Sequence, residues 1–190
     1  MPNSDRGWVR RLAIGLGAGG VVALVLVLGA RLFFASDEPA AAMDSPRFVE
    51  EAVAAGIEHV YDGDFLFFVG GGVAVFDCDE DGRPDLFLAG GVNPAALYRN
   101  ESEVGGVLSF VELADSVTDL TGVTGAYPLD IDSDGHLDLS VQRVGENVLL
   151  RGLGGCRFER ANEMWSFDGG EVWTVGFSAA WEGGAAFPSL

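Results

Sequence analysis

Two short acidic segments of the sequence repeat the same spacing of aspartates. The first, "DCDEDGRPDL", covers residues 77–86, and the second, "DIDSDGHLDL", covers residues 130–139. In each, alternate carboxylates are expected to converge on one point, together with the backbone carbonyl of loop position 7. The candidate metal-binding residues are Asp77, Asp79, Asp81, Arg83 and Asp85 in the first segment, and Asp130, Asp132, Asp134, His136 and Asp138 in the second.

Four carboxylates and one carbonyl form an all-oxygen donor set. Such a set suits a hard cation and fits Ca²⁺ better than Zn²⁺, whereas Mg²⁺ usually keeps more of its waters. Gly82 and Gly135 occupy loop position 6, where a sharp turn needs backbone freedom. Neither segment is an EF-hand, because position 12 is Leu88 or Val141 instead of glutamate. A charged turn that binds nothing would explain one such loop, but two matching loops favour a calcium site in each.

Apolar segments flank the two acidic loops in the same order. "GGGVAVFD" precedes the first loop and "VTGAYPLD" the second, while "LYRN" and "LLRG" follow them. Valine, phenylalanine, leucine and tyrosine bounded by glycine, asparagine and aspartate predict strands. Each unit is therefore predicted as strand, acidic loop, strand, short loop, strand, glycine-rich turn and strand. The runs "VAVF" and "LFLA" are continuously apolar, which predicts strands buried on both faces.

Four short strands in a unit of about fifty residues are typical of a β-propeller blade. The predicted fold is all-β, a partial β-propeller of about two four-stranded blades and the start of a third, after an N-terminal transmembrane helix. The repeats are expected at about 68–114 and 123–162, with an incomplete third unit at 172–190. Glu182 is the only acidic residue at a ligand position of that third unit, so we expect it to be metal-free. Because two blades cannot close a ring, we expect the chain to be the N-terminal part of a longer protein.

The N-terminal region has the pattern of a membrane anchor. Leu12–Ala30 carries no charge and, as a helix, would span about 28 Å, close to the thickness of the bilayer core. Arginines precede it, which favours a cytoplasmic N-terminus. A cleavable signal peptide with processing near residues 40–42 is the alternative, and the protein would then be secreted. The predicted segments are a basic cytoplasmic N-terminus at 1–11, a transmembrane signal anchor at 12–34, a linker at 35–47, and an extracytoplasmic (periplasmic or extracellular) repeat region at 48–190.

The charge balance excludes one class of partner. The chain has 29 acidic and 11 basic residues, all of the basic ones arginine, and a net charge of −18. Binding to nucleic acid needs a basic surface, so we expect no nucleic acid partner. The acidic excess suits a divalent cation.

The loop pattern and its flanks resemble the FG-GAP/VCBS repeats. "GGGVAVFDCDEDGRPDLFLAGG" is most similar to the cartilage acidic protein (ASPIC/UnbV) group, and the likeness covers residues 48–190. The resemblance implies a propeller, typically seven-bladed, with Ca²⁺ in the loop between the first two strands of a blade. For this chain, it implies that the aspartates of residues 77–85 and 130–138 are calcium ligands.

The remaining chemistry is sparse. Cys78 and Cys156 are the only cysteines, and either a disulfide between adjacent units or two unpaired thiols fits the sequence. No nucleophile–base pair is recognisable, so we expect no enzyme. The leading hypothesis is a Ca²⁺-stabilised extracytoplasmic propeller module, held to the membrane by its N-terminal helix, that binds protein or polysaccharide at the cell surface. The alternatives are a non-catalytic spacer in a larger envelope protein and, less favoured, part of a propeller-borne hydrolase or lyase.

Overall fold

A computed structural model describes residue 45 and residues 47–190. The predicted anchor at 12–34 lies outside these residues, as does nearly all of the predicted linker at 35–47. Within the described part, no helix has the length and apolarity needed to cross a bilayer. Residues 49–190 form one structural unit.

The first sheet is a four-stranded antiparallel meander. Its strands are β1 (Val73–Phe76), β2 (Asp85–Leu88), β3 (Ala96–Asn100) and β4 (Phe110–Glu112), in that order across the sheet. A short 3₁₀ helix, η1 (Phe65–Phe67), precedes them. Phe76 pairs with Asp85 at the end of the β1–β2 ladder, so the first acidic segment is the connection of this hairpin.

The second sheet repeats this meander. Its strands are β5 (Val123–Leu129), β6 (Asp138–Gly145), β7 (Val148–Gly152) and β8 (Phe158–Arg160), again in sequential order. Leu129 pairs with Asp138, so the second acidic segment connects β5 to β6 as the first connects β1 to β2. A two-residue strand, β9 (Val172–Trp173), pairs with the end of β6. The prediction of an all-β structure with two four-stranded units is confirmed.

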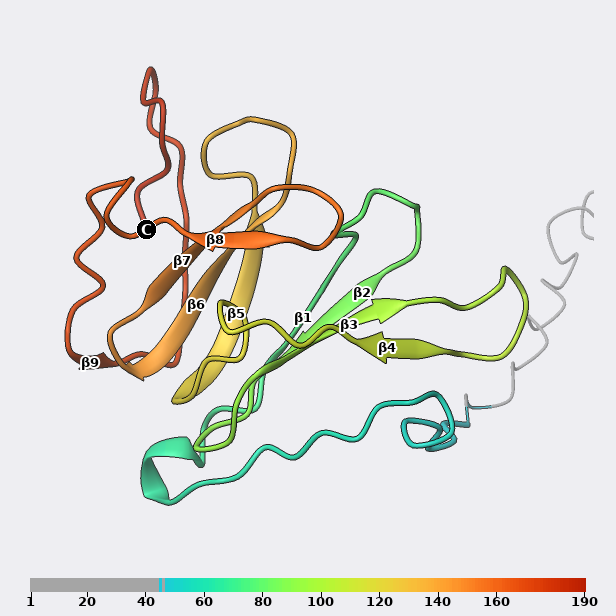
Figure 1. The fold of residues 1–190 in the computed structure, drawn as a ribbon. Coiled ribbons are helices and arrows are strands. Elements are labelled where there is room, and N and C mark those ends of the chain that lie inside the picture. The colour runs from blue at the N-terminus through green and yellow to red at the C-terminus, as the bar shows by residue number, and fades with distance from the viewer. Residues whose placement is uncertain (1–44, 46) are drawn as a thin grey trace, which may run out of the picture. The chain divides into compact units, whose positions relative to one another are not determined.

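The two sheets meet along their first strands, β1 and β5, and fan apart from there (Figure 1). Backbone hydrogen bonds join them at this seam, from the Gly72 amide to the Thr124 carbonyl (3.3 Å) and from the Gly91 amide to the Val123 carbonyl (3.0 Å). The two backbones approach each other closely here, since a Cβ added to Gly72 would lie only 3.2 Å from the Cα of Gly125. The facing sides of the sheets share one core, whose largest fully buried members are Phe87, Leu97, Leu139, Leu150, Val123, Val141 and Val148.

Burial of the predicted strands differs between the sheets. In β6, the first five residues are all buried, although Asp138, Ser140 and Gln142 among them are polar. In β1, Ala74 and Phe76 face the core, whereas Val73 and Val75 are 51% and 54% exposed. The prediction that "VAVF" is buried on both faces is therefore wrong for β1. The reason is that the second sheet covers only one of its faces.

The predicted third unit does not form a sheet of its own within the described residues. Val172 and Trp173 extend β6, and beyond them Ala180 and Ser189 form an isolated bridge. No strand covers Phe177–Trp181 in the structure described, although the sequence pattern predicts one there.

Candidate metal centre

Loop 1, residues 77–85, wraps around the carboxylate of its first aspartate. Asp77 Oδ1 accepts a hydrogen bond from the Asp81 amide (3.1 Å), and Asp77 Oδ2 accepts one from the Gly82 amide (2.8 Å). Gly82 makes the turn with a φ of +85°, in the left-handed region that favours glycine. These two hydrogen bonds hold the Asp77 carboxylate at the centre of the loop.

The last aspartate of loop 1 is held by two backbone amides. Asp85 is the first residue of β2 and is fully buried. Its Oδ2 accepts from the Cys78 amide (2.8 Å) and its Oδ1 from the Asn100 amide (2.8 Å), the latter at the end of β3. Two backbone donors from different segments therefore hold this carboxylate in one orientation.

Loop 2, residues 130–138, has the same construction. Asp130 accepts from the amides of Asp134 and Gly135, both at 3.1 Å. Asp138 is fully buried, and accepts from the amides of Ile131 (2.6 Å) and Gly152 (2.8 Å). The repetition of four equivalent hydrogen bonds shows that one local geometry has been built twice.

In each loop, three of the four predicted carboxylates come together. Ligand atoms of Asp77, Asp79 and Asp85 lie within 4.8 Å of one another, and the same is true of the second set, Asp130, Asp132 and Asp138. Asp79 Oδ1 is buried and accepts no hydrogen bond from the described part of the chain. A buried carboxylate oxygen without a donor is costly unless something cationic satisfies it. The donor set is all oxygen, so the residues present fit a hard cation such as Ca²⁺.

The fourth carboxylate of each loop lies outside its cluster. Asp81 accepts from the Arg83 amide (2.9 Å) and forms an ion pair with the Arg83 guanidinium. Asp134 accepts from the His136 amide (2.9 Å). The His136 ring contacts Glu80 of loop 1 through Nδ1 (2.6 Å), so its side chain is directed away from the loop 2 cluster. A ligand role for the position 7 carbonyls of Arg83 and His136 stays a prediction.

One functional residue was not anticipated from the sequence. Arg151, in β7, donates to Asp132 Oδ2 through Nε (2.7 Å) and to Asp134 Oδ2 through Nη2 (2.6 Å). It thereby partly neutralises loop 2. The signal that could have found it is the arginine shared by "LYRN" and "LLRG", but its counterpart Arg99 pairs with Glu101 instead.

The buried aspartates are shifted toward their protonated forms. Burial raises the pKa of Asp138 to about 6, against the opposing effect of the Gly152 and Ile131 amides; Asp132 and Asp134 raise it further. Burial likewise raises the pKa of Asp85. Carboxylates placed together in a poorly solvated site resist ionisation unless a cation compensates their charge.

The two cysteines form a disulfide that reaches loop 1. Cys78 is at position 2 of the loop, and Cys156 lies in the turn between β7 and β8; their Cα atoms are 4.6 Å apart. Of the two arrangements compatible with the sequence, the structure therefore has the cross-link between the two sheets.

Comparison with known families agrees with the repeat pattern. Residues 77–141 match the model of the FG-GAP-like repeat family. A comparison with curated proteins found no match. The matched segment contains loop 1, loop 2 and all three strands between β1 and β5. This match supports the FG-GAP part of the predicted resemblance and gives no support for the narrower ASPIC/UnbV group.

Proposed function

We propose that residues 49–190 are part of a calcium-stabilised, β-propeller-like module that works outside the cytoplasm and binds protein or polysaccharide. The match to the FG-GAP-like repeat supports a propeller-like binding module. Sheets joined at their first strands and packed face to face are also what neighbouring propeller blades require.

The observation that carries the calcium proposal is the duplicated carboxylate cluster. Both loops hold three aspartates within 4.8 Å of one another, and Asp79 Oδ1 is left buried without a donor in the described structure. When bound, Ca²⁺ supplies positive charge that offsets the repulsion between these carboxylates. Asp77, Asp79 and Asp85 would hold one ion, and Asp130, Asp132 and Asp138 the other.

We propose a binding role without catalysis. His59 Nε2 is 2.8 Å from the Ala89 carbonyl oxygen, and His136 contacts Glu80, so within the described residues neither histidine is paired with a serine, threonine or cysteine side chain. Fold alone does not select the ligand, because propellers carry many functions.

The location follows from the N-terminal sequence pattern. We propose that residues 12–34 anchor the protein in a membrane with the N-terminus in the cytoplasm, so that the repeat region is exported. A disulfide between the sheets is consistent with an oxidising compartment.

Isothermal titration calorimetry on the chelator-treated full chain tests the calcium proposal. We expect two Ca²⁺ per chain, with Zn²⁺ unable to displace them. The absence of Ca²⁺ binding would refute the proposal.

Glycan and protein arrays probed with and without Ca²⁺ test the binding role. A ligand captured only with Ca²⁺ supports it, whereas no ligand under either condition favours a spacer.

A further inference from the structure

Loop 1 and loop 2 share their carboxylate geometry but differ in the groups around it. At loop position 2, loop 1 has Cys78 and loop 2 has Ile131. On the third strand of each sheet, Arg99 and Arg151 are equivalent but have different partners. Because the carboxylate geometry is duplicated, differences in the surrounding groups decide whether the sites are equal.

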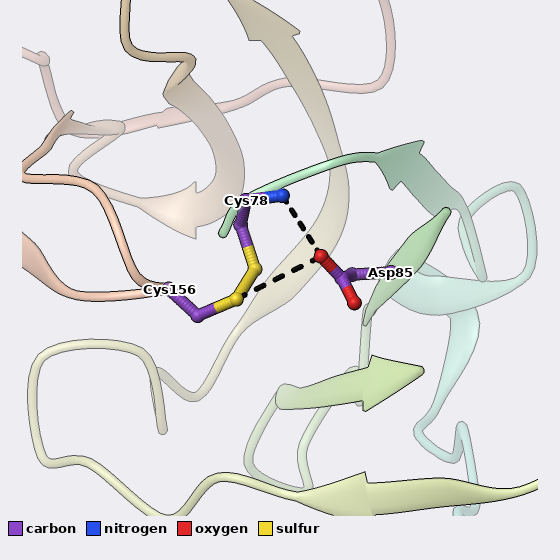
Figure 2. Close-up of side chains that lie close together, drawn as sticks. All are labelled: Cys78, Asp85 and Cys156. Carbon is purple, nitrogen blue, oxygen red and sulfur yellow. Dashed lines mark hydrogen bonds between the residues drawn. A yellow bond between two sulfur atoms is a disulfide. The ribbon is translucent and has the colours of Figure 1, made fainter. Parts of the chain in front are cut away.

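The disulfide contacts the interior of loop 1. The Cys78 amide donates to Asp85 Oδ2 (2.8 Å), and the Cys78 carbonyl accepts from the Cys156 amide (2.9 Å). Figure 2 shows both cysteines on one side of this carboxylate, with the Cys156 Sγ 3.7 Å from Asp85 Oδ2. The disulfide thus fixes the residue between Asp77 and Asp79 and contacts the buried carboxylate of Asp85.

Loop 2 has no such link. Ile131 donates its amide to Asp138 (2.6 Å) but makes no covalent connection to another segment. The guanidinium of Arg151 already occupies one oxygen of Asp132 and one of Asp134. A cation in loop 2 therefore competes with an arginine for Asp132, a member of the cluster. In loop 1 the Arg83 guanidinium pairs with Asp81, which lies outside the cluster, and Asp79 keeps a buried oxygen with no donor from the described residues.

We propose that the two sites are unequal, with loop 1 the tighter calcium site, and that the Cys78–Cys156 disulfide is the positioning element that makes it so. This inference rests on the proposed calcium function. A preformed cluster loses less freedom when it binds, so its affinity is higher. Removing a group that orients metal ligands typically lowers metal affinity by about 10-fold or more. Because coupling is reciprocal, Ca²⁺ in loop 1 makes the disulfide harder to reduce.

The first test separates the sites with a matched pair of variants in the full chain. Asp132→Asn leaves loop 1 intact, and Asp79→Asn, at the equivalent position, leaves loop 2 intact. Calorimetry with Ca²⁺ should give the lower Kd for Asp132→Asn. Equal affinities, or a lower Kd for Asp79→Asn, would overturn the inference.

The second test removes the disulfide in each background by Cys78→Ala together with Cys156→Ala. The Kd of loop 1 should rise by about 10-fold, whereas the Kd of loop 2 should stay within about 2-fold. A merely structural disulfide would weaken both sites alike, and that result contradicts a positioning role. If calorimetry detects no Ca²⁺ binding at either loop, the proposed function itself is refuted.

A measurement on the wild-type chain covers the case in which the double alanine variant does not fold. Dithiothreitol is titrated with and without Ca²⁺, and the reduced fraction is read by thiol alkylation and mass spectrometry. Ca²⁺ should shift half-reduction to a higher dithiothreitol concentration, and Asp79→Asn should lose most of that shift while Asp132→Asn keeps it. No shift in the wild type, although calorimetry shows Ca²⁺ bound, would overturn the inference and leave the calcium function standing.

Discussion

The buried carboxylate of Asp138 predicts how stability depends on pH when calcium is removed. Burial, the largest cause, raises its folded-state pKa to about 6 from an ordinary value of 3.8. At about 1.4 kcal/mol per pKa unit, this difference is worth about 3 kcal/mol. The side chain is fully buried, so little solvent screening reduces that value.

The direction of the pH dependence is set by whether the folded or the unfolded protein binds the Asp138 proton more tightly. Because the pKa of Asp138 is higher in the folded protein, its contribution favours folding fully below about pH 4 and is lost as the pH rises to about 6. The raised pKa of Asp85 acts in the same direction. Bound Ca²⁺ would favour the ionised carboxylates, so added calcium should remove this loss.

Urea unfolding of the chelated full chain at pH 4, 5, 6 and 7 measures the effect. Relative to Asp138→Asn, whose amide does not titrate, the wild type should lose about 2.4 kcal/mol of unfolding free energy between pH 4 and pH 7, because part of the full difference lies below pH 4. Asp168→Asn, at an exposed position, is the control and should keep the wild-type profile. A wild type that gains stability relative to Asp138→Asn over this range would show that the pKa of Asp138 is not raised by folding.

Four further predictions concern stability, calcium and topology. Leu150→Ala, at a fully buried core position, should lower the free energy of unfolding by about 3 kcal/mol in urea titrations, whereas Val107→Ala, at an exposed position, should change it little. Removing the disulfide, which joins residues 78 positions apart, should cost about 4.5 kcal/mol by the chain-entropy estimate, and a change below about 1 kcal/mol would contradict it. Ca²⁺ at 100 times its Kd should add about 2.7 kcal/mol per site to stability, seen as a rise in Tm that chelation reverses. A reporter that is active only outside the cytoplasm should be active when fused after Pro46 and inactive when fused before Gly7; Arg10→Glu with Arg11→Glu should weaken that orientation, and a mature N-terminus near Met43 would show cleavage instead.

The sequence predicted the repeated hairpins well because their signals are local. Aspartates at fixed spacing, Gly82 and Gly135 at the turn, and apolar runs on either side identify each hairpin without tertiary information. The same local signals placed Asp77, Asp79 and Asp85 in one cluster, which the structure confirms as a grouping of side chains.

The features that the sequence did not predict depend on contacts between segments distant in the chain. Val73 and Val75 are exposed because the second sheet covers only the other face of β1. A run of apolar residues does not show which face of a strand will be covered. The pairing of Cys78 with Cys156 needs the β7–β8 turn to lie beside loop 1. Likewise, Arg151 and Arg99 occupy equivalent strand positions, yet their partners differ because long side chains select among several nearby carboxylates.

The proposed calcium sites are tested most directly by locating calcium in a crystal of the protein. Anomalous diffraction from crystals grown with Ca²⁺, or with Tb³⁺ as its substitute, should show one peak among Asp77, Asp79 and Asp85 and a second among Asp130, Asp132 and Asp138. The loop 1 peak should have the higher occupancy at limiting cation concentration. Crystals that diffract well, contain the cation in excess and show no peak at either cluster would mean that these aspartates do not bind calcium.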